Sequence, residues 1–148
     1  MSQWWAVPML ITGGLFVGGV VSIAWERVPA WRATDLADFQ AGLAHTLRRM
    51  DRLQPALLVV CLGSTIGFAS SAGGAARTLA ALAAGGLLVV LVGSVTLLVP
   101  IQRRLVASGP APPPAAAEAL RARWLGGHLV RTAVALGCFA LAVAATVV

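Results

Sequence analysis

The chain has 148 residues, of which 59% are hydrophobic and only 11% charged, and its mean hydropathy is +0.87. Soluble domains carry about 25% charged residues, so this chain could not cover a water-facing surface, and we expect a single-domain integral membrane protein, residues 1–148. Its formal net charge of +6 comes from arginines that flank apolar segments. Membrane topology explains that pattern, so no nucleic-acid partner is expected.

Four apolar segments approach the roughly 20 residues that are needed to cross a bilayer. In chain order they are residues 4–24, 55–72, 78–101 and 129–148. The first has no basic residue ahead of it and no clear cleavage site after it, so we interpret it as a retained span. Glycines recur on the first and third spans and suit close helix packing in lipid. The sequence therefore predicts an all-α membrane protein, an up-down bundle of four transmembrane helices.

The arginines predict the orientation of these helices. Five lie between the first and second spans and four between the third and fourth, whereas only Arg77 separates the second from the third. The positive-inside rule then places both long connections in the cytoplasm and both termini on the non-cytoplasmic side. We expect the bacterial cytoplasmic membrane to be the location.

The two cytoplasmic connections differ in kind. Residues 31–54 have helical periodicity and are predicted to extend the second helix below the membrane. Residues 108–114, "SGPAPPP", predict a short, stiff surface loop because they are rich in proline. A helix is predicted to restart at Ala115 and run to the C-terminus, with Gly126-Gly127 as a soft point.

A polar stripe opens the fourth span. In "RARWLGGHLVRT" the spacing of three, four and three residues puts four side chains on one helical face: Arg121, Trp124, His128 and Arg131. Arg131 lies inside the apolar run, where a guanidinium facing lipid is costly. It is predicted either to snorkel to the headgroups or to face the bundle, with Glu26 or Asp51 as its partner.

Further polar residues are expected at the same level. His45 and Arg49 precede the second span, Glu26 ends the first and Gln102 ends the third. All four helices would then bring polar groups to the cytoplasmic end. The other arginines and the tryptophans near helix ends fit ordinary interfacial anchoring. Cys61 and Cys138 are expected to be buried small hydrophobic residues, with no disulfide and no metal site.

These residue types favour proton abstraction from a flat, acidic, lipophilic molecule. A neutral histidine accepts protons near neutral pH, a fixed guanidinium stabilises an enolate or phenolate, and an indole offers a flat aromatic face. Hydrolysis fits poorly, because no Ser or Cys nucleophile lies beside a base at this end. Zinc is not expected with two histidines and few carboxylates. A haem held between His45 and His128 stays open.

Two stretches carry a family resemblance: "VPIQRRL" (residues 99–105) and "RARWLGGHLVRTAVAL" (residues 121–136). With "GGLFVGG" and "LRRMDRLQP", the chain resembles the anthrone-oxygenase-like membrane proteins, catalogued as domain of unknown function family 1772. Gln102 departs from the family, which often has Asn there. Members with assigned activity oxidise anthrones to anthraquinones in polyketide pathways, using molecular oxygen and no organic cofactor. By position, the resemblance implicates Gln102, Trp124, His128 and Arg131.

The leading hypothesis is a membrane-embedded oxygenase for an aromatic, anthrone-like or polyketide-type lipophilic substrate, with oxygen as co-substrate and no cofactor. His128 would act as the base, Arg131 would stabilise the anion, Trp124 would stack on the ring and Gln102 would orient a carbonyl or phenol. Residues expected to contact the substrate are Arg49, His45, Glu26 and Arg121.

Two alternatives remain. The chain could be a non-enzymatic accessory or assembly subunit whose arginines bind a partner protein or anionic membrane lipid. It could also be a haem- or metal-binding redox protein. A channel is disfavoured, because no polar stripe runs the length of any span. The sequence leaves a homo-oligomer open.

Overall fold

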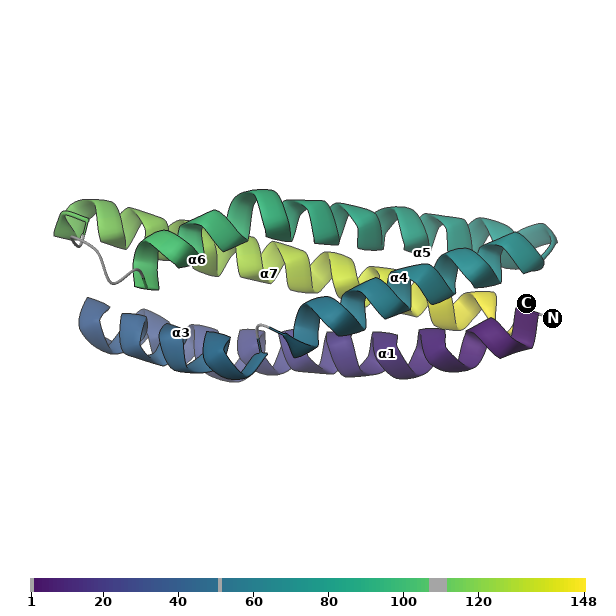
Figure 1. Ribbon diagram of the computed structural model, residues 1–148, viewed down its shortest axis with the longest axis horizontal. Helices are drawn as coiled ribbons and strands as arrows, with labels where there is room; N and C mark the ends of the chain where they lie inside the picture. The colour runs from purple at the N-terminus through teal and green to yellow at the C-terminus, as the bar shows by residue number, and fades with distance from the viewer. Residues whose placement is uncertain (1, 51, 107–111) are drawn as a thin grey trace.

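Figure 1 shows the computed structural model, which describes residues 2–50, 52–106 and 112–148. Every element in these ranges is helical, so the all-α prediction is confirmed. The elements in chain order are α1 (Ser2–Ser22), η1 (Ile23–Arg27), α2 (Val28–Ala33), α3 (Leu36–Met50), α4 (Leu53–Ser71), α5 (Gly74–Gly93), η2 (Ser94–Leu98), α6 (Val99–Val106) and α7 (Pro114–Ala145).

Four helical stretches are long and apolar enough to cross a membrane: Gln3–Ala33, Leu53–Ser71, Gly74–Val106 and Pro114–Ala145. The protein is therefore an integral membrane protein with four spanning helices. Three of these stretches, of 31, 33 and 32 residues, are much longer than the predicted spans. At 1.5 Å per residue, α7 is about 48 Å long, well beyond a hydrocarbon core of about 30 Å.

The prediction that α7 restarts near Ala115 and continues unbroken through Gly126-Gly127 is confirmed. It begins at Pro114, a residue well suited to a first helical position, where no backbone N–H is needed. Of the predicted proline-rich loop, residues 108–111 lie outside the described residues.

The spanning helices lie side by side and run in alternating directions (Figure 1). α1 packs against α4 and α7, and α5 packs against the same two helices. Both termini lie at one end of the molecule. We call the opposite end, where α2, α3 and α6 lie, the distal end. The sidedness of the two ends stays a prediction.

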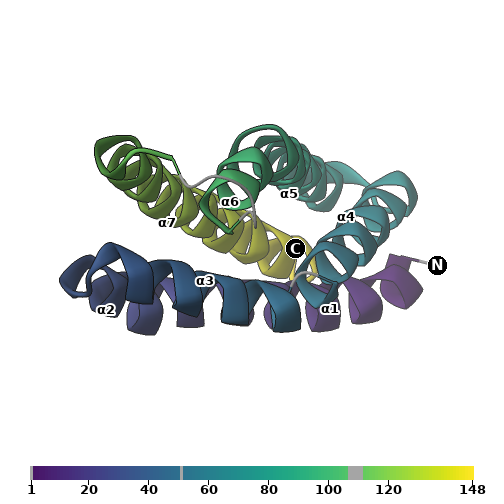
Figure 2. The ribbon, with the colours of Figure 1, turned by 60° about the vertical axis from the view of Figure 1, so that its left-hand side comes forward.

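α3 is a separate helix, so the predicted continuous extension of the second span is wrong. It ends at Met50, and α4 begins at Leu53. Pro55 explains the break, since proline donates no hydrogen bond and clashes with the preceding turn unless it lies in the first turn of a helix. Views from two directions show α3 on the side of α1 and α2 (Figure 1, Figure 2). Gln40 holds it to α6 through a 2.9 Å hydrogen bond from Nε2 to the Leu105 carbonyl.

Two π-helical turns, η1 and η2, occur in the first and third spanning helices, and each is followed by Val-Pro. The Val28 N–H donates to the Ile23 carbonyl, and the Val99 N–H donates to the Ser94 carbonyl, both across five residues. Pro29 and Pro100 would clash with the carbonyl four residues earlier in a regular α-helix. A π turn relieves that clash and leaves the helix unbroken.

Three apolar layers stack along the molecule. The layer at the terminal end contains Met9 and several alanines, and the middle layer contains Phe16, Val20 and the two free thiols of Cys61 and Cys138. The distal layer is aromatic. In it Trp31 packs edge-on against Phe39 and Trp124, with ring centroids 5.7 Å apart in both pairs.

Close packing of α5 on α7 generates a stability prediction. A Cβ at Gly86 would overlap Sγ of Cys138, whereas a Cβ at the neighbouring Gly85 would meet nothing within 4 Å. We expect Gly86→Ala to destabilise the fold by about 1–3 kcal/mol, as overpacking does. Gly85→Ala should leave stability unchanged or slightly raised, because alanine favours helix. Thermal unfolding in detergent, followed by circular dichroism, compares the two variants, and equal stability would contradict the described packing.

Candidate functional site

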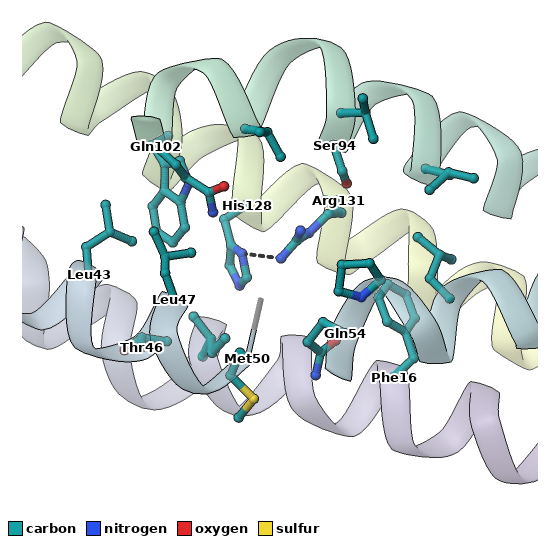
Figure 3. Close-up of a pocket in the computed structure, with 17 residues that line it drawn as sticks. Phe16, Leu43, Thr46, Leu47, Met50, Gln54, Ser94, Gln102, His128 and Arg131 are labelled. Carbon is teal, nitrogen blue, oxygen red and sulfur yellow. Dashed lines mark hydrogen bonds between the residues drawn. The ribbon is translucent and has the colours of Figure 1, made fainter. Parts of the chain in front are cut away.

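A cavity of about 110 Å³ lies between the middle and distal layers, and Figure 3 shows the side chains that line it. Most of the lining is apolar. The polar side chains in it are Thr46, Gln54, Ser94, Gln102, Trp124, His128 and Arg131. Pro55 on α4 and Val95 on η2 belong to the lining and are also exposed. The cavity therefore opens between these two helices.

His128 is fully buried and joins α7 to α1. Its Nε2 lies 3.2 Å from the Val20 carbonyl, and its Nδ1 lies 2.9 Å from a terminal nitrogen of Arg131. A guanidinium only donates, so Nδ1 carries the lone pair and Nε2–H donates to the carbonyl. Both ring nitrogens are thus engaged in the neutral imidazole.

Trp124 lies against His128, one turn earlier on α7. The two rings are stacked, with centroids 5.3 Å apart and planes 18° apart. Trp31 and Phe39 cover other parts of the indole. Its Nε1–H is buried and has no described partner. The indole lines the cavity, but neighbouring rings cover much of it, where the sequence predicted an open aromatic face.

Arg131 extends from α7 into the cavity (Figure 3). Its Nε is buried without a described partner, and no described carboxylate pairs with it. Glu26, one predicted partner, is exposed on η1, and Asp51, the other, lies outside the described residues. Among the described residues this cation is held by a neutral imidazole, which leaves its charge uncompensated in a largely apolar space.

Two amides line the cavity from different helices. Gln102 does so from α6, as predicted, whereas Gln54 on α4 was missed. Gln54 Oε1 is buried without a described partner, and its amide nitrogen lies where a Cβ at Gly19 would be. Its position in the sequence could have identified Gln54 as a candidate. It is a polar residue at the start of an apolar span, and such a residue is costly in lipid unless it faces the protein interior.

Four predicted site residues lie outside the cavity, and three of them are exposed. His45, Arg49 and Glu26 are exposed. α3 turns Leu43, Thr46, Leu47 and Met50 toward the cavity, so His45 and Arg49 fall on another face of that helix. The two histidines are consequently not brought together. In the described ranges no group of three or more His, Cys, Asp or Glu side chains could hold a metal ion.

Arg121 is buried but belongs to a different part of α7. Its guanidinium donates to the carbonyl of Trp31 and, at 2.9 Å, to that of Thr34, and it pairs with Glu118 at 3.3 Å. It also lies over the Phe39 ring, 5.1 Å from the centroid. Carbonyls at a helix C-terminus attract cations, so Arg121 fastens the end of α2 to α7. It does not line the cavity.

A groove of about 440 Å³ lies on the other side of η2, between η2 and α7. Its walls include Leu97 and Val130, both about two-thirds exposed, as expected for a surface that faces lipid. Ser94 and Arg131 line both this groove and the cavity. These two side chains therefore form part of the wall between them.

The fold and site define an integral membrane protein with four spanning helices and a largely apolar cavity, to which α7 contributes Trp124, His128 and Arg131. Residues 43–141, more than half of the chain, match the anthrone oxygenase family, so the chain belongs to that family and the resemblance seen in the sequence motifs is confirmed. The matched range contains every cavity residue except Phe16 and Ile23. No curated protein and no solved structure matches the chain.

The contacts of Arg121 predict a structural role. Replacing it by Met leaves the Trp31 and Thr34 carbonyls without their charged donor, so Arg121→Met should destabilise the fold by about 1.5–3 kcal/mol. Arg123→Met, which removes an exposed arginine two residues away, should change stability by less than about 0.5 kcal/mol. Thermal unfolding in detergent measures both. An Arg121→Met protein as stable as the wild type would contradict this role.

Proposed function

We propose that the protein is an oxygenase that converts an aromatic, anthrone-like or polyketide-type lipophilic substrate to a quinone, with oxygen as co-substrate and no cofactor. We place it in the bacterial cytoplasmic membrane with both termini outside, and expect no nucleic-acid partner. Family membership supports the reaction class. The observation that carries the proposal is the guanidinium of Arg131, held by His128 in a largely apolar cavity.

A cation that has no carboxylate partner in the described part of the chain favours an anionic ligand. Loss of a proton from the methylene of an anthrone gives an enolate whose charge gathers on the carbonyl oxygen. At 4 Å and an effective dielectric constant of about 20, a guanidinium would stabilise that charge by about 4 kcal/mol. That is about a thousandfold in the acidity of the substrate. The guanidinium of Arg131 would thus favour the deprotonation step, which forms the electron-rich enolate.

The overall reaction needs no external reductant. The enolate carbon gives one electron to oxygen, the resulting radical and superoxide combine into a peroxide, and loss of one water leaves the new carbonyl. One anthrone and one O₂ therefore yield one anthraquinone and one H₂O. The protein has only to bind, deprotonate and stabilise the substrate.

The hydrogen bond between His128 and Arg131 affects how His128 could act as the base. Its lone pair on Nδ1 accepts a hydrogen bond from Arg131. We propose that the substrate oxygen takes over the hydrogen bond from Arg131, which frees Nδ1 to receive the methylene proton. Gln102, from α6, would orient a carbonyl or phenol, and the indole N–H of Trp124 would add a donor.

These roles predict the effect of two substitutions. His128→Asn and Arg131→Gln should each lower anthrone-dependent oxygen uptake by about 10²–10⁴-fold, the range typical of a lost base or a lost electrostatic stabiliser. The matched controls His45→Gln and Arg123→Gln change exposed residues outside the cavity and should retain wild-type uptake. Size-exclusion profiles in detergent check that each variant is folded.

If the His128→Asn variant retains turnover, His128 is not the base of this reaction. A stoichiometric haem or metal in the purified wild-type protein, detected by visible absorbance and metal analysis, would contradict the cofactor-free reaction. It would revive the redox alternative that the two histidines suggested.

A second candidate function rests on the distal surface. Arg48, Arg52 and Arg103 line one hollow of about 470 Å³ and are exposed. Three arginines in one hollow suit an anionic lipid headgroup or an acidic partner protein, as an accessory subunit would require. Stoichiometric co-purification of a partner, together with no oxygen uptake on any anthrone, would favour this function over the oxygenase. A homo-oligomer is a further expectation that the same purification measures.

A further inference from the structure

Three buried side-chain atoms in the described part of the protein have no hydrogen-bond partner: Gln54 Oε1, Trp124 Nε1 and Arg131 Nε. Proteins satisfy the large majority of such atoms, so each exception calls for an explanation. All three residues line the same cavity. Their concentration at one place makes the cavity a candidate site for a ligand that supplies the missing partners.

The three atoms differ in what they can bind. The indole Nε1–H and the guanidinium Nε–H only donate, whereas the amide oxygen of Gln54 only accepts. A complementary ligand therefore carries oxygen acceptors and, in addition, at least one donating hydroxyl. Because the rest of the lining is mostly apolar, the remainder of that ligand is apolar too.

The side-chain amide of Gln54 lies close to α1. Its amide nitrogen lies in the space beside Gly19 that any other side chain would fill. Figure 3 shows Gln54 across from Arg131 and beside Phe16. With the nitrogen against α1, the oxygen is left as the only acceptor among the three unpartnered atoms.

We propose that Gln54 is a specificity-determining residue: its Oε1 accepts a hydrogen bond from a hydroxyl on the aromatic ligand, and Gly19 keeps it in position for that contact. The inference rests on the proposed function and deepens it, since it selects hydroxyaryl ketones over unsubstituted ones. A ligand without the hydroxyl leaves the buried acceptor unpaired, which should lower affinity by about 10- to 100-fold.

Two quinones that undergo no turnover test the inference: 1,8-dihydroxyanthraquinone and unsubstituted anthraquinone. Their dissociation constants are measured in detergent for the wild type, Gln54→Met and Gly19→Ala. Wild-type protein should prefer the dihydroxy compound by about 10- to 100-fold. In Gln54→Met, which keeps the side-chain length and removes both polar atoms, the two constants should converge through weaker binding of the dihydroxy compound alone.

Glycine substitutions provide a second, independent arm. Gly19→Ala displaces the amide and should reduce the preference, whereas a Cβ at the neighbouring Gly18 meets nothing within 4 Å, so Gly18→Ala should retain it. A preference that survives in Gln54→Met and Gly19→Ala, or a wild type that binds both quinones equally, would overturn the proposal.

The two proposals fail separately. Hydroxyl preference in binding, with no oxygen uptake on any anthrone, supports the Gln54 inference and overturns the oxygenase function. Equal binding and equal kcat/KM for hydroxylated and plain anthrones overturn the Gln54 inference and leave the oxygenase standing.

Discussion

The imidazole of His128 is the contact on which the site depends. One ring nitrogen binds the Val20 carbonyl of α1 and the other receives the guanidinium of Arg131. Removal of the ring would leave a buried carbonyl and a buried cation each short of a partner, and both are costly in an apolar interior. The histidine thus sets the distance between α1 and α7 and aims the charge at the cavity. Trp124, stacked on it, closes one side of that arrangement.

The distal layer holds this contact in place. Trp31 and Phe39 pack around Trp124, and Arg121 ties the end of α2 to α7 beneath them. The two Val-Pro steps let the first and third spanning helices pass the cavity with π turns and without a break. A break there would expose backbone groups that lipid cannot satisfy. The helices can therefore bend around a cavity and remain compatible with the membrane.

Helical periodicity and hydropathy were enough to predict the four spanning helices and the cavity face of α7. Periodicity also put Trp124, His128 and Arg131 on the face of α7 that lines the cavity, and Gln102, at the end of the third spanning stretch, lines it too. Arg121 shows the limit of spacing: it shares the face of Arg131 but lies about 15 Å away along the axis, ten residues at 1.5 Å each. Residue spacing predicts which side of a helix a residue lies on. Whether that residue reaches the cavity also depends on where the neighbouring helices lie along the axis.

The remaining differences arise from tertiary packing. His45 and Arg49 lie outside the cavity because α3 ends before Pro55 and has its own rotation. Gln54 enters the site only because Gly19, 35 positions earlier in the sequence, leaves room for its amide. No local pattern links those two residues. Arg131 was expected either to reach the headgroups or to pair with a carboxylate inside the bundle, and its partner among the described residues is a histidine on its own helix, one turn earlier.

The position of Arg131 also bears on how the protein enters the membrane. It lies near the middle of α7 and just inside its apolar part, where an arginine that faces lipid adds to the cost of inserting a helix. α7 follows the other three spanning helices in the chain, and α1, which provides the Val20 carbonyl, is the first of them. The helices that pack against the polar face of α7 are therefore synthesised before α7. During biogenesis the guanidinium of α7 can move from the translocon directly into protein, without passing through lipid.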